Sequence, residues 1–210
     1  MPDKYKNKYR IPSARLQTWD YGSNAAYFIT ICTKNRNHLF GKIFNNETQL
    51  NEIGKLAEQF WLEIPVHFSF IELGNFVVMP NHVHGILIID KPLVDKGDVD
   101  YNVETRQCLV STTMTPITPN VPVNTPPTNN KTIGQTRFQN QGKGTISSIV
   151  GSYKSVVSKK AGFINPLFGW QSRFHDHIIR DAQSFETIQN YIANNPANWK
   201  DDKFNNQSQS

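Results

Sequence analysis

Apolar residues recur along this chain at two different spacings, and the two spacings predict a mixed α/β fold. The β-branched and aromatic run 25–33 is typical of a strand. From 50 to 64, apolar residues recur at steps of three and four, which predicts an amphipathic helix that ends at Pro65. Further strand-like runs follow at 68–73, 76–79 and 82–89, with a bulge expected at Gly74-Asn75 and a turn at Pro80-Asn81.

A long polar interruption divides this first half of the chain from the second. Residues 111–130 contain no charged residue but five Pro and six Thr, so they cannot bury enough apolar surface to offset the entropy lost on ordering. We therefore expect a flexible insertion over 91–142. Beyond it, the pattern predicts a helix over 145–161, a strand over 174–179, a helix over 184–194 and a disordered tail over 205–210.

Without the insertion, the order of the elements is β-α-β-β-α-β, which is the ferredoxin-like arrangement. We expect an α+β fold with an antiparallel sheet, both helices on one face and an additional C-terminal helix. The length of 210 residues and the hydrophobic content of 38% suit a single domain over 1–210.

Composition and charge favour a polyanionic partner and argue against a membrane protein. The net charge is +5 and the pI about 9.2, and Lys/Arg outnumber Asp/Glu five to one in 1–15 and six to one in 142–180. Ordinary solubilising charge would give the same pattern. The chain has no apolar run of the ~20 residues that span a membrane, no apolar segment of a signal peptide and only two cysteines, so we expect a cytoplasmic protein.

Four of the six histidines form two pairs, His82-Val83-His84 and His175-Asp176-His177. Since side chains alternate along a strand, both histidines of a pair point to the same face and lie close enough to share one cation. Two imidazoles leave coordination positions open for a substrate oxygen. The ordinary alternative is a pair with no ligand role. The turn before His82 and the small Gly85 after His84 favour a site at the first pair.

Four segments of the chain resemble, in order, segments of one known family. They are 76–89 (Phe-Val-Val-Met-Pro-Asn-His-Val-His-Gly-Ile-Leu-Ile-Ile), 151–154, 170–181 and 191–199. They are similar to the single-tyrosine HUH transposases (named for the His-hydrophobic-His motif) and especially to the REP-associated branch. The resemblance covers most of the chain outside 91–142. It implies an enzyme that cuts and rejoins single-stranded DNA with Mg²⁺ or Mn²⁺, on a substrate that folds as a hairpin.

The resemblance implies that a tyrosine on the helix after the histidine hairpin is the nucleophile, and Tyr153 occupies that place. It would attack the phosphodiester and form a 5′-phosphotyrosine bond, with the metal at His82 and His84 stabilising the charge on the phosphate. The alternative is that Tyr153 is a core residue, because it lies on the apolar stripe of its helix. The other tyrosines are weaker candidates: Tyr27 lies in a strand, Tyr191 in the terminal helix, Tyr101 in the insertion, and Tyr5, Tyr9 and Tyr21 in the N-terminal arm.

Family members often have a third metal ligand, commonly an amide, one helical turn after the tyrosine. That position here is Val157, which cannot bind a metal. His175, Asp176 and His177 are candidates for this ligand or for contacts with DNA. The DNA-binding residues that we expect around the site are basic: Lys143, Lys154, Lys159, Lys160, Arg173 and Arg180.

Some relatives work as dimers, so a homodimer with an exchanged tyrosine helix is one arrangement that the insertion would permit. Two other functions stay open on the sequence alone. One is a DNA- or RNA-binding module without catalysis, serving the host in a domesticated role. The other is a metal-dependent nuclease that uses water in place of Tyr153.

Overall fold

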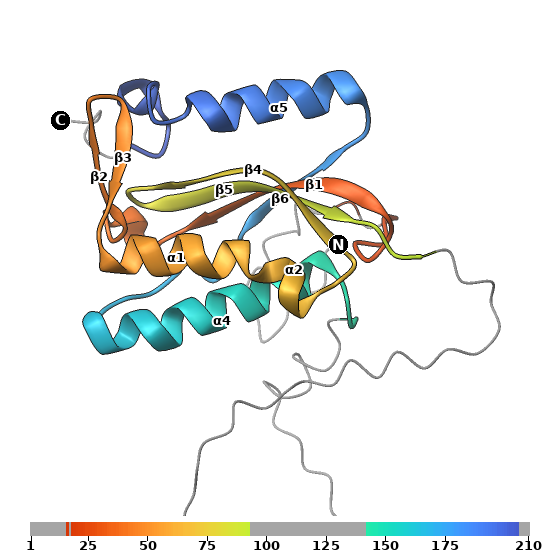
Figure 1. The fold of residues 1–210 in the computed structure, drawn as a ribbon, viewed down its shortest axis with the longest axis horizontal. Coiled ribbons are helices and arrows are strands. Elements are labelled where there is room, and N and C mark those ends of the chain that lie inside the picture. Colours follow the sequence, from red (N-terminus) through yellow and green to blue (C-terminus); the bar gives the residue numbers. More distant parts are fainter. Residues whose placement is uncertain (1–15, 17, 93–141, 206–210) are drawn as a thin grey trace, which may run out of the picture. The chain divides into compact units, whose positions relative to one another are not determined.

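The computed structural model describes residues 16, 18–92 and 142–205, all of which belong to one compact unit (Figure 1). Their helices and strands are, in chain order, β1 (Ala25–Cys32), η1 (Lys34–Arg36), β2 (Gly41–Phe44), β3 (Glu47–Leu50), α1 (Glu52–Leu62), α2 (Ile64–His67), β4 (Ile71–Met79), β5 (His82–Ile89), α4 (Ile146–Ile164), β6 (His175–Ile179), α5 (Ala182–Asn194) and η2 (Trp199–Asp201).

The main sheet has four antiparallel strands in the order β4-β5-β1-β6. With α1 between β1 and β4, and α4 between β5 and β6, this is the predicted ferredoxin-like α+β fold, which is confirmed. β4 and β5 form the predicted hairpin through Pro80 and Asn81. The register of this pair shifts between Leu73 and Phe76, which confirms the bulge expected at Gly74-Asn75.

The two faces of the sheet carry different layers of the protein. On one face, α1 and α4 pack over a large apolar core, as predicted, and this core includes Tyr27, Trp61 and Val83. α5 packs on the other face over a smaller cluster built on Ile86 and Ile192. Figure 1 shows α5 on one side of the sheet and α1 with α4 on the other. Because side chains alternate along β5, Val83 belongs to the first face and its two neighbours to the second.

The helices begin at capping residues that the sequence supplies. The Asn51 side chain accepts a hydrogen bond from the Gly54 amide at the start of α1, and Thr145 and Ser148 form a capping box at the start of α4. Asp181 caps α5 in the same way. Pro65 does not simply end a helix: it lies in the first turn of the short α2, where its missing N–H costs no hydrogen bond.

The β2-β3 hairpin was not predicted from the pattern of apolar residues. Each of its strands has four residues with alternating intermediate and exposed positions, so no apolar run marks them. Its turn is made by Asn45 and Asn46, both at positive φ, which is the geometry of a two-residue hairpin turn.

Three predicted segments lie outside the described residues: nearly all of the insertion 91–142, the basic N-terminal residues 1–15 and most of the tail 205–210. In the part of the chain that the structure does describe, no helix has both the length and the apolar character needed to cross a membrane.

Candidate metal centre

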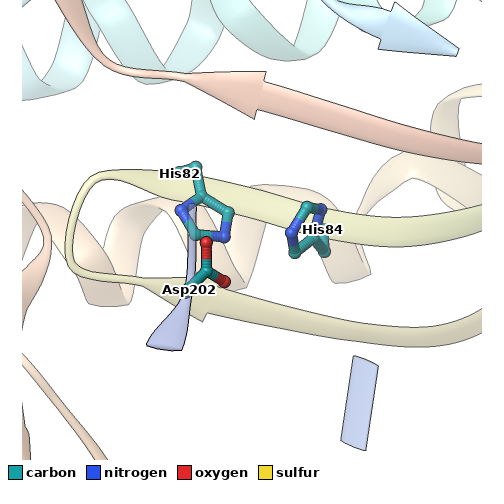
Figure 2. Close-up of side chains that lie close together, drawn as sticks. All are labelled: His82, His84 and Asp202. Carbon is teal, nitrogen blue, oxygen red and sulfur yellow. The ribbon is translucent and has the colours of Figure 1, made fainter. Parts of the chain in front are cut away.

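His82 and His84 stand at the start of β5 on the face covered by α5. His82 pairs with Cys32 of β1 and Met79 of β4, and His84 pairs with Thr30 and Val77. Their ring centroids are 4.3 Å apart, and their exposed fractions are 0% and 1%. The predicted sharing of one face is confirmed, and the two rings converge (Figure 2).

Asp202 completes this cluster and was not among the predicted site residues. One ligand atom from each of His82, His84 and Asp202 lies within 4.8 Å of the others, so the three residues could hold a metal ion. The carboxylate lies beside the His82 ring in Figure 2. It is held by the Phe204 amide, which donates to Oδ1 at 2.7 Å, and by the Asn195 side chain, which donates to Oδ2 at 3.0 Å.

Asp202 belongs to residues 199–205, which we name the C-terminal strap. The strap covers both histidines: the Phe204 ring lies 4.7 Å from that of His82 and 5.7 Å from that of His84, and Trp199 lies 6.1 Å from His82. Arg36 holds the strap in place, since its Nη1 donates to the Lys203 carbonyl at 3.2 Å. The strap therefore both supplies the carboxylate and closes the site.

Both imidazoles are held in the neutral form that binds metals. Burial, followed by the charges of Lys203 and His175, lowers the pKa of His84 to about 3. Burial also lowers the pKa of His82 well below its ordinary value, together with the charges of His84, Arg36 and Lys203. At neutral pH each ring therefore carries no charge and offers one nitrogen lone pair.

The donor set of two imidazoles and one carboxylate fits a divalent cation. Within the described residues, two buried polar atoms at this site make no hydrogen bond: His82 Nε2 and Asn195 Oδ1. Buried groups of this kind ordinarily have a partner, and a bound cation would supply one for His82 Nε2. Imidazole nitrogen suits Mn²⁺ better than Mg²⁺, which prefers oxygen ligands.

Tyr153 is not brought to this cluster. Its exposed fraction is 2%, its ring meets Trp61 edge to face at 5.3 Å, and its hydroxyl donates to the Ala57 carbonyl at 3.0 Å. Burial raises its pKa, which disfavours the phenolate. The prediction that its helix stripe faces the histidine pair is wrong, because α4 packs on the face that Val83 presents and the histidines point to the other.

Tyr191 of α5 is the tyrosine that lies at the histidines. Its hydroxyl is 3.3 Å from His84 Nε2, the two rings are 5.4 Å apart, and 41% of the residue is exposed. Burial and the charge of Asp202 raise its pKa, while a hydrogen bond with the Asn195 side chain lowers it. Asn195 stands four residues after Tyr191, so an amide one helical turn past the tyrosine is present here. The same spacing of four residues after Tyr153 leads to Val157, which has no amide side chain and is fully buried in the core.

The second histidine pair stands beside the cluster and outside it. His175 pairs with Thr30 on β1, whose other neighbour is His84, so the three residues form a row across the sheet. His175 and His177 are exposed, and Asp176 points to the opposite face with Ile29. The group that could hold a metal is completed by Asp202. A role of His175, Asp176 and His177 as a third ligand or in a contact with DNA stays a prediction.

The predicted basic residues are spread over the protein. Lys154, Lys159 and Lys160 belong to α4, which packs on the face opposite the histidines, and Lys154 Nζ donates to the Gln171 carbonyl at 2.7 Å. Lys143, Arg173 and Arg180 are exposed. The charges that reach the histidines come instead from Arg36 and Lys203, which the sequence did not single out.

Fold and site together define a ferredoxin-like α+β protein with a His-His-Asp group that could hold a metal ion. The chain is 35% identical over 193 residues to an uncharacterised protein of Haemophilus influenzae, an alignment that covers 91% of both chains. The chain belongs to the same family as that protein. No family model matches it.

Two solved structures are similar in fold at a low level. One is a REP-associated tyrosine transposase bound to a REP hairpin, with a TM-score of 0.48 and 17% identity, covering 90% of this chain and 74% of that one. The other is a Deinococcus radiodurans R1 protein assigned as a transposase, with a TM-score of 0.41 and 13% identity, covering 87% of this chain and 97% of that one. Neither likeness is close enough to define a function, which must be inferred from the site.

Proposed function

We propose that this protein is a metal-dependent transposase that cuts and rejoins single-stranded DNA, with Tyr191 rather than Tyr153 as the nucleophile. The observation that carries the proposal is the position of the Tyr191 hydroxyl, 3.3 Å from His84 Nε2 at the edge of the His82-His84-Asp202 cluster. A phenol beside a candidate metal centre suits nucleophilic attack on a phosphate. Hairpin-forming DNA is the substrate class that the four family-like segments imply.

In the proposed reaction, Tyr191 Oη forms a bond to the phosphorus while the bond from phosphorus to the 3′-oxygen breaks. The phenol proton is lost to solvent, and the leaving 3′-oxygen takes up a proton to become a hydroxyl. The product is a 5′-phosphotyrosine linkage. A 3′-hydroxyl of another strand can then attack this linkage and release the phenol, so the strands are joined without a further energy source.

His82, His84 and Asp202 would hold the divalent cation, and Asn195 would hold the Asp202 carboxylate, to which its side chain donates at 3.0 Å. When bound, the cation supplies positive charge that offsets the negative charge developing on the phosphate oxygens. Arg36 and Lys203 add positive charge close to the same place and would attract the DNA backbone. Two expectations from the sequence stay predictions. One is a homodimer, and the other is contact between DNA and six basic residues: Lys143, Lys154, Lys159, Lys160, Arg173 and Arg180.

The test is covalent capture of DNA by purified wild-type protein and two phenylalanine variants. The probe is a set of 5′-labelled and 3′-labelled DNA hairpins with randomised single-stranded flanks, incubated with Mn²⁺ or Mg²⁺ and resolved under denaturing conditions. Tyr191→Phe should abolish the adduct. Tyr153→Phe is the matched control: it loses one hydrogen bond, worth about 1 kcal/mol of stability, and should keep adduct formation within a few-fold of wild type.

Three other outcomes would overturn the proposal. An adduct that persists in Tyr191→Phe and disappears in Tyr153→Phe would return the nucleophile to Tyr153. If both variants cleave the hairpins and neither forms a covalent adduct, the protein is a nuclease that uses water as its nucleophile. Binding of the hairpins without cleavage by any of the three proteins would identify a non-catalytic module.

A further inference from the structure

Asn81, the residue before His82, has every polar atom of its side chain engaged. It is fully buried. Its Oδ1 lies 2.8 Å from His82 Nδ1, and its Nδ2 donates to two carbonyls, that of Phe204 at 2.7 Å and that of Arg36 at 3.2 Å. Its backbone carbonyl accepts from both the amide and the hydroxyl of Thr33, so the turn that carries it is fixed independently.

These contacts determine which way the Asn81 amide faces. A carbonyl oxygen can only accept, so the two carbonyls of Arg36 and Phe204 require the NH₂ group. The oxygen of the amide must then face His82, and a flipped amide would place three oxygens against one another. Since Asn81 Oδ1 cannot donate, His82 Nδ1 carries the proton, and His82 Nε2 is left with its lone pair.

His82 Nε2 is also the atom that has no hydrogen-bond partner within the described residues. We infer that Asn81 is a positioning residue that fixes His82 in the Nδ1–H form and so presents the Nε2 lone pair to a divalent cation. The hydrogen bond to Phe204 ties the same amide to the strap, so one side chain sets the histidine and holds the segment that supplies Asp202. The inference rests on the proposed function in one respect only: the reaction on DNA in which the bound cation would be used.

Removal of the Asn81 side chain separates this role from a purely structural one. Asn81→Ala leaves the backbone bonds to Thr33 in place but frees the His82 ring. We expect the imidazole of His82 to become a mixture of the two neutral forms, and Mn²⁺ affinity to fall by about 10- to 100-fold, as is typical when the partner of a ligating histidine is lost. Nitrogen-15 NMR of the imidazoles in the metal-free protein measures the first effect, and titration calorimetry with Mn²⁺ measures the second.

Two further variants keep the test decisive. Thr33→Val is the matched control, because it removes hydroxyl bonds to the carbonyls of Asn81 and Asn37 in the same turn without touching the ring. Asn81→Asp keeps an acceptor for His82 Nδ1–H but sets its second oxygen against the carbonyls of Arg36 and Phe204. It should therefore retain the Nδ1–H form, while its Mn²⁺ affinity falls because the strap is no longer held. It also decides the question if the alanine variant does not fold.

The inference is overturned if Asn81→Ala keeps the Nδ1–H form, or if its loss of Mn²⁺ affinity is no greater than that of Thr33→Val. It is also overturned if Asn81→Asp loses the Nδ1–H form. Both measurements are made without DNA, so a wild-type protein that never cleaves DNA would sink the proposed function and leave this inference standing.

Discussion

At the residue scale, the site depends on groups that are close in space and far apart in sequence. Gly85 shows how closely the layers meet behind the histidines, since a Cβ there would overlap the Trp61 indole and approach Phe76. On the other side of β5, the carboxylate of Asp202 reaches His82 from a position 120 residues further along the chain. Replacing Gly85 would therefore shift the strand that carries both histidines. Asp202 belongs to the strap, so it can be replaced without disturbing that strand.

The contribution of Asp202 can be measured against its own neighbour. Asp202→Asn removes the charged ligand and should lower Mn²⁺ affinity by at least about tenfold, because a carboxylate is the only negative group of the cluster. Asp201→Asn is the matched control, as it makes the same chemical change one residue earlier and outside the cluster. Titration calorimetry of both variants checks this, and equal affinities in the two would remove Asp202 from the metal centre.

At the scale of elements, periodicity located the strands and helices of the main sheet but could not assign its faces. The helix over 145–161 was predicted to place an apolar stripe on the sheet, and α4 does so. A stripe does not say which of the two faces it covers, so it could not show whether Tyr153, which the family resemblance favoured, lies at the histidines. Asn195, four residues after Tyr191, was a signal in the sequence that favours Tyr191, the nucleophile that we propose. Asp202 gave no such signal, since only tertiary packing brings the strap to β5.

The start of α5 gives a prediction about pH, because this helix carries Tyr191. Asp181 accepts hydrogen bonds from the Ser184 amide at 2.7 Å and the Ser184 hydroxyl at 2.9 Å, and these bonds lower its pKa, the backbone bond contributing most. The folded pKa lies below the unfolded one, so the capping carboxylate stabilises the protein above the ordinary pKa of Asp and loses this effect as the pH falls through the folded pKa.

Asp181→Asn keeps a capping oxygen and removes the titration. We expect wild type to have the higher melting temperature at pH 6 and the difference to shrink as the pH falls below about 4, the ordinary range for Asp. Thermal unfolding of both proteins over pH 3 to 7 measures this. A difference that stays constant across the range would show that the charge of Asp181 does not stabilise α5.

At the scale of the whole described unit, the two histidines and Tyr191 are closed off from solvent to different degrees. His82 and His84 are almost fully covered by the strap, while Tyr191 remains open at the edge. If the protein acts on DNA as proposed, the exposed Tyr191 would be open to a phosphate in the closed form, whereas the buried histidines would be reached only when residues 199–205 move. In the proposed function, the closed strap would supply the Asp202 carboxylate to the cation, and movement of the strap would free a position for the substrate.

Phe204→Ala tests whether the strap controls access to the metal. The Phe204 ring contacts both histidines and lies under Arg36 at 5.1 Å, and each aromatic contact of this kind is worth about 0.5–1.5 kcal/mol. Loss of the ring should favour the open strap by roughly tenfold, since about 1.4 kcal/mol corresponds to a factor of ten. Release of bound Mn²⁺ to excess chelator, followed by stopped flow, should accelerate by that factor. Phe163→Ala, an exposed phenylalanine on α4, is the control and should leave the rate unchanged. If both variants release the metal at the wild-type rate, the strap is not the barrier to metal release.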